Sequence, residues 1–389
     1  MNEDMIKTLK ESEKHRKSHP YWVWESIQEM PDILGKCLDE PVTGQIESVE
    51  KEFLNREINK IVLLGRGSSY FLTLSEKYLF DRILNIQTSC AVTNVFESYP
   101  DTSIDEKTAV FFHSHSGKSE GDIKVINNAN DQGAFTVGIT DIPSSPLAGV
   151  VDSVIIGPGG SKVELPATRT YASAMYRMML LAVKLGNKFG DAKTAEYYEK
   201  YLREIPGVLE KFIPAFEPQA ERIAKELISC GSFVIVGFGP NLSTADEAAM
   251  AFSQATGHPS QAFEMENYIH GPMQALSPEQ CVVIIAPEGP LQDRNLRLAQ
   301  ACNIIGAKTL VLAPKKYQEQ LDVDLFVEMP AEITDIVSPV FYMVSLWQIG
   351  YRLGLFGKGG HPDRLSMDKE NFKQGFSFLM KKDKWVTQK

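Results

Sequence analysis

The sequence predicts an α/β protein made of two duplicated, doubly wound parallel-sheet domains with a helical N-terminal arm. From about residue 60, short apolar runs rich in β-branched residues alternate with helix-length segments, which is typical of a parallel sheet covered by helices. A long helical stretch, Thr170 to Leu185 and Ala192 to Ser229, interrupts the pattern, which then restarts. Two similar units therefore follow each other along the chain.

Apolar periodicity assigns the elements of each unit. The first unit is expected to contain strands at Ile61–Leu64, Ala109–Phe112, Phe135–Ile139 and Ser153–Ile156, with helices at Ser69–Leu84 and Ser119–Ala129. The second is expected to contain strands at Phe233–Val236, Val282–Ile285, Thr309–Leu312 and Leu325–Val327, with helices at Ala245–Ala255, Leu291–Ile304 and Ile336–Leu353. The run Val62 to Gly67 is matched by Val234 to Gly239, and the matching order of neighbouring elements favours duplication over chance similarity.

The first fifty residues are expected to form a helical arm. A charged segment, Ile6 to Lys17, runs into an apolar face that begins at Tyr21 and ends near Pro31. The remaining bounds are 51–200 for the first domain, 201–356 for the second, and 357–389 for a C-terminal tail that contributes to the active site.

The composition of the 389-residue chain is that of a globular protein, with 43% hydrophobic and 23% charged residues. Its apolar runs are shorter than the roughly 18 residues of a membrane span, and the charged N-terminus does not resemble a secretion signal, so we expect a cytoplasmic protein. A net charge of -10 argues against general binding to nucleic acid or an anionic membrane. Any anion must therefore be held locally.

The cysteine pattern predicts reduced thiols. The five cysteines are widely separated and odd in number, so they support neither a disulfide framework nor a zinc site. No metal or cofactor is expected.

A turn rich in hydroxyl groups, Ser114 to Ser119, follows an apolar strand and precedes a helix. In a parallel sheet this places the turn at the carboxyl end of a strand and at a helix N-terminus, where backbone N–H groups and the helix dipole favour an anion. Its serines add donors, and Gly117 permits close approach to a ligand. The turn is therefore a candidate phosphate site, with a serine N-cap in an incidental turn as the structural alternative.

The segment Gly65 to Ser69 ends the preceding strand and can bring Ser69 to the same crevice. It does not match the dinucleotide fingerprint, because Tyr70 occupies the third glycine position, and the chain also lacks the P-loop pattern. Nucleotide binding is therefore not expected.

Three segments together resemble the sugar isomerase (SIS) domain family: Gly65 to Ser69, Ser114 to Ser119, and Glu266 to Pro272. The resemblance is to double-domain members, namely the isomerase half of glucosamine-6-phosphate synthase and the deglycases that split adducts such as fructoselysine 6-phosphate. It covers the chain from about Tyr21 to about Asp368.

The resemblance implies where the substrate lies. His115 stands where glutamine is common in the family and is expected to bind the phosphate, while Ala167 and Thr168 line the sugar end of the pocket. The other residues that the resemblance assigns to the phosphate are Ser69, Ser114, Ser116 and Ser119.

The second half is expected to play a different part. Its corresponding turn, Ala286 to Pro290, has no hydroxyl and carries a carboxylate, so one phosphate site per chain is expected. His270 matches the histidine that opens the sugar ring in the synthase, and the resemblance implies that it reaches the active site of a neighbouring subunit. A homodimer follows, and histidine suits proton transfer near neutral pH.

The family pattern breaks at the catalytic base. Gln254 occupies the position of the glutamate that moves a proton between C1 and C2, and an amide cannot accept that proton, so Gln254 is assigned to substrate binding. Glu247 on the same helix does match a family glutamate, and the resemblance therefore assigns it a catalytic role. The family lysine that contacts the open-chain sugar falls at about Met367, close to Lys369.

Glu266 is our predicted base, because it lies four residues before His270 in the same loop. A glutamate in a partly closed pocket can have its pKa raised into the range useful for acid–base work. A structural or hydroxyl-binding role is the alternative for this carboxylate.

The leading functional hypothesis is an enzyme that acts at C1 and C2 of a 6-phosphorylated amino sugar or sugar–amino acid adduct, releasing the amine and a hexose 6-phosphate. Because the sequence begins Met1-Asn2-Glu3, without the cysteine nucleophile of a glutaminase domain, synthesis from glutamine is not expected. The alternatives are an aldose–ketose isomerase and a non-catalytic sugar-phosphate sensor acting on a protein partner.

Overall fold

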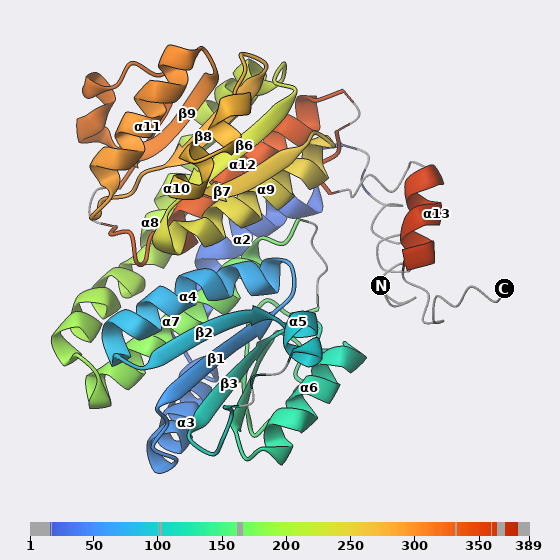
Figure 1. The fold of residues 1–389 in the computed structure, drawn as a ribbon, viewed down its shortest axis with the longest axis vertical. Helices are drawn as coiled ribbons and strands as arrows, with labels where there is room; N and C mark the ends of the chain where they lie inside the picture. The colour runs from blue at the N-terminus through green and yellow to red at the C-terminus, as the bar shows by residue number, and fades with distance from the viewer. Residues whose placement is uncertain are drawn as a thin grey trace.

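The computed structural model describes residues 16, 18–99, 101, 103–161, 166–330, 333–358, 360–363 and 370–379. Two α/β units lie one above the other in Figure 1, the first coloured blue to green and the second yellow to orange. Each unit is built on a five-stranded sheet in which all paired strands run parallel. The predicted fold class is confirmed.

The first unit contains one sheet and the helices that cover it. Its strands are β1 (Lys60–Gly65), β2 (Gln87–Val92), β3 (Thr108–His113), β4 (Phe135–Thr140) and β5 (Ser153–Ile156). Its helices are α3 (Val42–Asn55), α4 (Ser68–Leu84), α5 (Thr93–Ser98), α6 (Glu120–Asp131) and α7 (Arg169–Phe189).

The second unit repeats this plan. Its strands are β6 (Ser232–Gly237), β7 (Ser260–Glu264), β8 (Gln280–Ile285), β9 (Lys308–Pro314) and β10 (Leu325–Met329). Its α-helices are α8 (Ala192–Leu227), α9 (Leu242–Thr256), α10 (Met265–Ile269), α11 (Gln292–Ile305) and α12 (Pro339–Phe356). Three short 3-10 helices complete it: η1 (Gly239–Asn241), η2 (Pro272–Ala275) and η3 (Lys315–Gln320).

Strand order is the same in the two sheets. It is β2-β1-β3-β4-β5 in the first and, read in the same direction, β7-β6-β8-β9-β10 in the second. In each sheet the winding of the chain reverses between the first and third strands of the unit, and open α/β sheets bind ligands at the carboxyl edge of such a switch point. In the first unit that point lies between β1 and β3.

A glycine at the end of the first strand serves the same purpose in both units. A Cβ atom on Gly65 would lie 2.1 Å from the carbonyl oxygen of Ser69, and one on Gly237 would lie 2.1 Å from that of Asn241. Two residues later, Gly67 and Gly239 have positive φ angles of 53° and 52°. The repeated Gly-x-Gly sequence is therefore the strand-to-helix turn of the duplicated fold.

Helices packed between the two sheets join the units. Helices α4 and α9 contact each other, as Figure 1 shows, and α8 packs along both α7 and α12. Tyr171 of α7 meets Trp347 of α12 edge to face, with 5.8 Å between ring centroids. The largest cluster of buried apolar side chains draws on both units, and smaller clusters cover the other face of each sheet. Both sheets are thus covered on two faces, as parallel sheets require.

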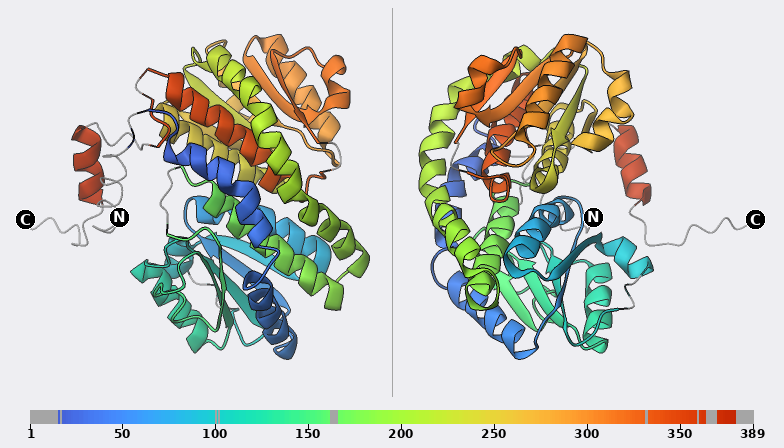
Figure 2. Two further views of the ribbon diagram at one scale, coloured as in Figure 1. Left: turned by 180° about the vertical axis from the view of Figure 1, so that it is seen from behind. Right: turned by 60° about the vertical axis from the view of Figure 1, so that its left-hand side comes forward.

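The N-terminal segment packs against the helical layer as α2 (Trp22–Lys36), which lies beside α8 in both views of Figure 2. Of the helix expected over Ile6 to Lys17, only Arg16 lies within the described residues. The apolar face does not end near Pro31 as expected, because α2 continues through this proline and buries Ile33 and Leu34 beyond it.

The C-terminal segment is tied to the start of α2. The Asp363 carboxylate accepts hydrogen bonds from the backbone N–H groups of Trp22 and Val23, at 2.8 and 2.9 Å, and so caps that helix. The backbone N–H of His361 donates to the carbonyl of Ala255 at the end of α9, at 2.9 Å. Met367 and Lys369 lie outside the described residues; beyond them α13 (Glu370–Leu379) stands clear of both units in Figure 1.

Candidate functional site

A pocket opens at the switch point of the first sheet. The space between its lining atoms, counted together with the open solvent at its mouth, is about 350 Å³. Several of the side chains that line it come from separate elements: Ser69 from the start of α4, Ser114 and His115 from the turn after β3, Asp141 after β4, and Tyr171 and Arg177 from α7. The pocket therefore collects residues that are distant in sequence.

The turn from Ser114 to Ser119 starts at this pocket, where Ser114 and His115 line it. Ser119 is the N-cap of α6, where its hydroxyl accepts from the Asp122 N–H at 3.4 Å, and the Ser114 hydroxyl accepts from the Gly117 N–H at 3.2 Å. Ser116 is exposed. The first N–H groups of a helix have no intrahelical acceptor, so this end of α6 favours an anion.

Gly117 is required by the turn itself. Its φ angle is 58°, and a Cβ atom there would lie 2.5 Å from the Ser145 hydroxyl oxygen. The backbone carbonyl of Gly117 also accepts from the Leu147 N–H at 3.0 Å. The loop after β4 thus holds the turn close.

Arg66 adds a cation that the sequence did not single out. Its guanidinium lies 2.9 Å from the Asp122 carboxylate, and a Cβ atom on Gly121 would lie 2.8 Å from its Nη2 atom. Burial raises the pKa of Asp122, and the Arg66 charge acts in the opposite direction. The guanidinium therefore covers the first turn of α6, beside the proposed anion site.

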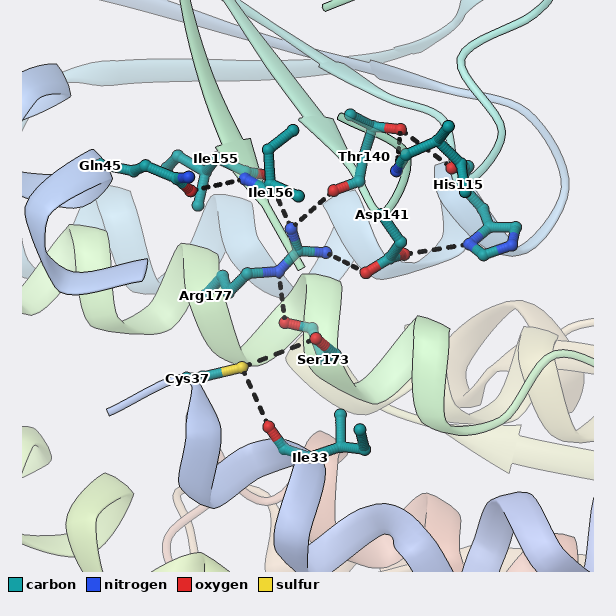
Figure 3. Close-up of polar contacts among 11 residues, drawn as sticks. Ile33, Cys37, Gln45, His115, Thr140, Asp141, Ile155, Ile156, Ser173 and Arg177 are labelled. Carbon is teal, nitrogen blue, oxygen red and sulfur yellow. Dashed lines mark hydrogen bonds and ion pairs between the residues drawn. The ribbon is translucent and has the colours of Figure 1, made fainter. Parts of the chain in front are cut away.

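Figure 3 shows a polar network that includes His115, Asp141 and Arg177, three residues that line the pocket. The His115 Nδ1 atom lies 3.0 Å from the Asp141 Oδ2 atom, and Arg177 donates from Nη2 to the other carboxylate oxygen at 3.3 Å. The His115 side chain is 32% exposed, whereas those of Asp141 and Arg177 are 2% and 0% exposed. Only the histidine of this group reaches the opening.

A second pair of ionisable groups is buried beside this network. His113, the last residue of β3, places its Nε2 atom 3.1 Å from the Glu76 carboxylate of α4, and both side chains are 1% exposed. Burial raises the pKa of Glu76, while His113 and Arg177 act in the opposite direction. His113 also lines the pocket.

The corresponding crevice in the second unit is occupied by the protein's own polar groups. Glu288, in the turn Ala286 to Pro290, forms an ion pair with Lys316 at 2.9 Å. Asn241, which corresponds to Ser69, donates to the Ser338 hydroxyl at 2.7 Å. These contacts support the expectation of one phosphate site per chain, which stays a prediction.

Of the residues assigned to the substrate, Ser69, Ser114, His115 and Ala167 line the pocket, whereas Ser116, Ser119 and Thr168 do not. Thr168 is fully buried immediately before α7.

The remaining four candidates, Glu247, Gln254, Glu266 and His270, all lie in the second unit, and none lines this pocket. Glu247 is buried and Gln254 half-buried in α9.

The loop that carries Glu266 and His270 is exposed. The His270 side chain is 78% exposed and its Nε2 atom lies 3.7 Å from the Glu266 carboxylate. Glu266 also forms a bidentate salt bridge with Arg294. The hydrogen bond from Arg294 is the main reason that the pKa of Glu266 is lowered, opposite to the rise expected for a base in a closed pocket. Its assignment as base stays a prediction.

Asp246 of α9 is a carboxylate that sequence reasoning missed. Burial raises its pKa to about 6. It is close enough to Tyr171, which lines the pocket, to add to the rise in that tyrosine's pKa, whose largest cause is burial. Asp246 is not part of an apolar pattern that would single it out. The resemblance does not single it out either, because the family glutamate on this helix corresponds to its neighbour Glu247.

Metal-ligating side chains do not cluster in the described part of the chain. No three His, Cys, Asp or Glu side chains there are placed to hold a metal ion. In the same part of the chain, no helix combines the length and apolarity needed to cross a bilayer. All five cysteines are free thiols, four of them buried.

Comparisons with known proteins show which family and which solved structures this chain is similar to. Residues 56–184 match the SIS domain family. The glutamine–fructose-6-phosphate aminotransferase (isomerizing) of Thermococcus kodakarensis is 25% identical over 363 residues, which cover 92% of this chain and 58% of that protein. The chain thus spans less than two thirds of the length of this relative.

Solved structures share the fold. The C-terminal domain of glucosamine-fructose-6-phosphate aminotransferase from Francisella tularensis has a TM-score of 0.77 at 18% identity, covering 87% of this chain and 97% of that one. Glucosamine-6-phosphate deaminase from Thermotoga maritima has a TM-score of 0.69 at 19% identity, covering 88% and 97%. Tagatose-6-phosphate ketose/aldose isomerase from Escherichia coli has a TM-score of 0.74 at 15% identity, covering 89% and 95%.

The raised pKa of Asp246 predicts a pH-dependent effect of the Asp246→Asn substitution. Because the folded-state pKa lies above that of the unfolded chain, the stability linked to this group is present at low pH and is lost as the pH rises through about 6. The variant should therefore exceed wild type in unfolding free energy by roughly 1–2 kcal/mol at pH 7 and by much less at about pH 4. Urea unfolding of both proteins at the two pH values measures this, and a difference that does not change with pH contradicts it.

Proposed function

We propose that this chain is an enzyme that acts at C1 and C2 of a 6-phosphorylated amino sugar or sugar–amino acid adduct, because residues 56–184 match the SIS domain family. It releases the amine and leaves a hexose 6-phosphate. The proposal is supported by the pocket between β1 and β3, which is lined by Ser114 and His115 of the turn that leads into α6.

The names of related proteins support amine chemistry. The relative from Thermococcus kodakarensis is named an aminotransferase of fructose 6-phosphate, and the solved structure from Thermotoga maritima is named a deaminase of glucosamine 6-phosphate. Both names describe an amine and a 6-phosphorylated hexose. A deglycase or deaminase reaction combines the same two groups.

The phosphate of the substrate anchors it in the first unit. Ser69 and Ser114 line the pocket directly, and Ser116 and Ser119 present their hydroxyls from the same turn. A bound hexose then extends toward Ala167 and Thr168. The opened sugar chain brings C1 and C2 to the side of the pocket formed by α7.

The proton-transfer groups come from a second subunit in this proposal. His270 is exposed on its own subunit, which leaves its imidazole available to a neighbour. A homodimer in which each subunit lends His270 to the other completes the site for ring opening. Glu266 accompanies His270 as the base, Glu247 of α9 is the third catalytic residue, and Gln254 of the same helix contacts the substrate.

An aldose–ketose isomerase is the second candidate function. It is favoured by the likeness to the structure named tagatose-6-phosphate ketose/aldose isomerase. The two reactions share ring opening and differ in whether an amine leaves. A non-catalytic sensor, the third possibility from the sequence, would bind the phosphosugar without turnover.

An assay of amine release separates these functions. Purified protein is incubated with a panel of 6-phosphorylated amino sugars and sugar–amino acid adducts, and free amine and hexose 6-phosphate are quantified together. We expect stoichiometric release from at least one substrate. Ser116→Ala should weaken substrate affinity by about tenfold through loss of a charge-assisted hydrogen bond, with Ser229→Ala, an exposed serine after α8, as the matched control.

The same assay tests Glu266. Glu266→Gln should lower kcat by at least about 100-fold without weakening phosphosugar binding. Full activity would place the base elsewhere, with Asp246 as the next carboxylate to replace. Interconversion of aldose and ketose phosphates without amine release would favour the isomerase, and tight binding with no turnover at all would exclude an enzyme.

Subunit mixing tests the shared active site. A His270→Asn chain and a Ser116→Ala/Ser119→Ala chain are each expected to be nearly inactive alone. Mixed dimers contain one site with an intact phosphate turn from one chain and His270 from the other, so mixing after mild dissociation should restore activity. Activity of the mixture no greater than the sum of the separate variants would show that His270 does not act across the interface.

A further inference from the structure

His115 is held in place at the pocket by contacts to its backbone and to its ring, and the role inferred for it rests on the proposed phosphate site. The backbone of His115 is fixed first. Its carbonyl accepts from the Thr140 hydroxyl at 2.9 Å and from the Asp141 N–H at 3.3 Å, both at the end of β4. The imidazole therefore leaves the turn from a defined position.

The ring is then oriented by Asp141. An imidazole nitrogen that faces a carboxylate has to carry its proton, because a lone pair there would be repelled. The 3.0 Å contact between His115 Nδ1 and Asp141 Oδ2 thus selects the Nδ1–H form of the neutral ring. Nε2 lies on the far edge of the ring, where no described residue is its partner, and the His115 ring lines the pocket (Figure 3).

Asp141 is in turn held by Arg177. The guanidinium donates from Nη1 to the carbonyls of Thr140 and Ile155, at 3.0 and 2.7 Å, and from Nε to that of Ser173 at 3.1 Å. With the contact to Asp141, all three nitrogens of this fully buried group are in use. Arg177 cannot reach a ligand itself, so its charge acts on the pocket only through the carboxylate.

Gly157 leaves room for the Asp141–Arg177 ion pair because it has no side chain. A Cβ atom on Gly157 would lie 1.8 Å from the Asp141 Oδ1 atom and 2.6 Å from the Arg177 Cζ atom. The second unit has no such arrangement at its equivalent turn, where Glu288 pairs with Lys316. The network belongs to the unit that carries the hydroxyl-rich turn.

We propose that Asp141, anchored by Arg177, is a positioning residue that aims the His115 Nε2 atom at the phosphate, so that His115 binds the phosphate dianion as an imidazolium that donates to one of its oxygens. The ring takes up one proton from solvent when the phosphate binds and then donates from both nitrogens, to Asp141 and to the ligand. This contact selects a phosphorylated sugar over a neutral one.

A double-mutant cycle with fructose 6-phosphate as the probe tests the coupling. His115→Ala should weaken binding about 10- to 100-fold, the value of a charge-assisted hydrogen bond. Asp141→Asn should weaken binding about tenfold in the His115 background, because the neutral ring still donates, and should have no further effect in the His115→Ala background. Equal losses in both backgrounds would show that Asp141 acts by another route.

A structural carboxylate supplies the control. Asp152 accepts from the Thr136 N–H at 3.0 Å at the opposite edge of the same sheet. Asp152→Asn should lower the melting temperature without changing the affinity for fructose 6-phosphate. If it weakens binding as much as Asp141→Asn does, general destabilisation explains the loss and the proposal is wrong.

Imidazole ¹⁵N NMR gives a readout that does not depend on affinity. The free wild-type protein should show His115 protonated at Nδ1, Asp141→Asn should shift the proton to Nε2, and fructose 6-phosphate should protonate both nitrogens in wild type. A ring that samples both neutral forms in the free protein, or an Nε2 that stays unprotonated when the phosphosugar is bound, overturns the proposal.

The proposed function and the positioning role of Asp141 would be refuted by different results. If wild type binds fructose 6-phosphate no better than fructose while the free-state signals are as expected, the positioning of the ring stands but the pocket does not bind phosphate, which overturns both the phosphate contact and the phosphosugar function. If wild type prefers the phosphosugar but Asp141→Asn changes neither affinity nor tautomer, only the positioning role is lost.

Discussion

The guanidinium of Arg177 is fully buried at the carboxyl edge of the first sheet, and its charge has to be compensated there because an ion removed from water costs several kcal/mol. The compensation comes from the ends of two strands and from Asp141. By satisfying these acceptors, Arg177 fixes β4 and β5 relative to α7. This constraint also orders the pocket, because Asp141 lies 3.0 Å from the His115 ring and both residues line it.

The two units share one scaffold because the domain is duplicated, and they differ at the turn that follows their third strand. Both units need the close approach at Gly65 and Gly237 and the same strand order, so these features persist in each. At the next turn the two units differ: one presents serines and a histidine, the other a carboxylate that pairs with Lys316. A carboxylate repels a phosphate, so a common fold can keep its anion site in one unit and use the other for packing and for the His270 loop.

Periodicity predicted the strands that contain a continuous apolar run and the long helices that bury one apolar face. It missed β2 and β7, which are edge strands with the half-exposed sequences Gln87-Thr88-Ser89-Cys90-Ala91-Val92 and Ser260-Gln261-Ala262-Phe263-Glu264. Such strands lack a continuous apolar run, so only their pairing with β1 and β6 identifies them.

The candidate site was predictable where it is local in sequence. The serines, Gly117 and the helix start lie within one short segment, and strand–turn–helix order is enough to place them. Asp141 and Arg177 were not predictable, because they meet His115 only through the packing of β4 and α7 against β3. The same is true of Glu76 and His113, and of Asp246, whose raised pKa arises from burial and leaves no mark on the sequence.

We propose that the turn in the first unit holds the phosphate of a sugar phosphate. A crystal structure of the protein with a bound hexose 6-phosphate tests it most directly. The account predicts the phosphate at the start of α6, in contact with the turn Ser114 to Ser119 and within about 3 Å of the His115 Nε2 atom. A phosphate bound instead at the turn Ala286 to Pro290, or a sugar whose phosphate points away from α6, would contradict it.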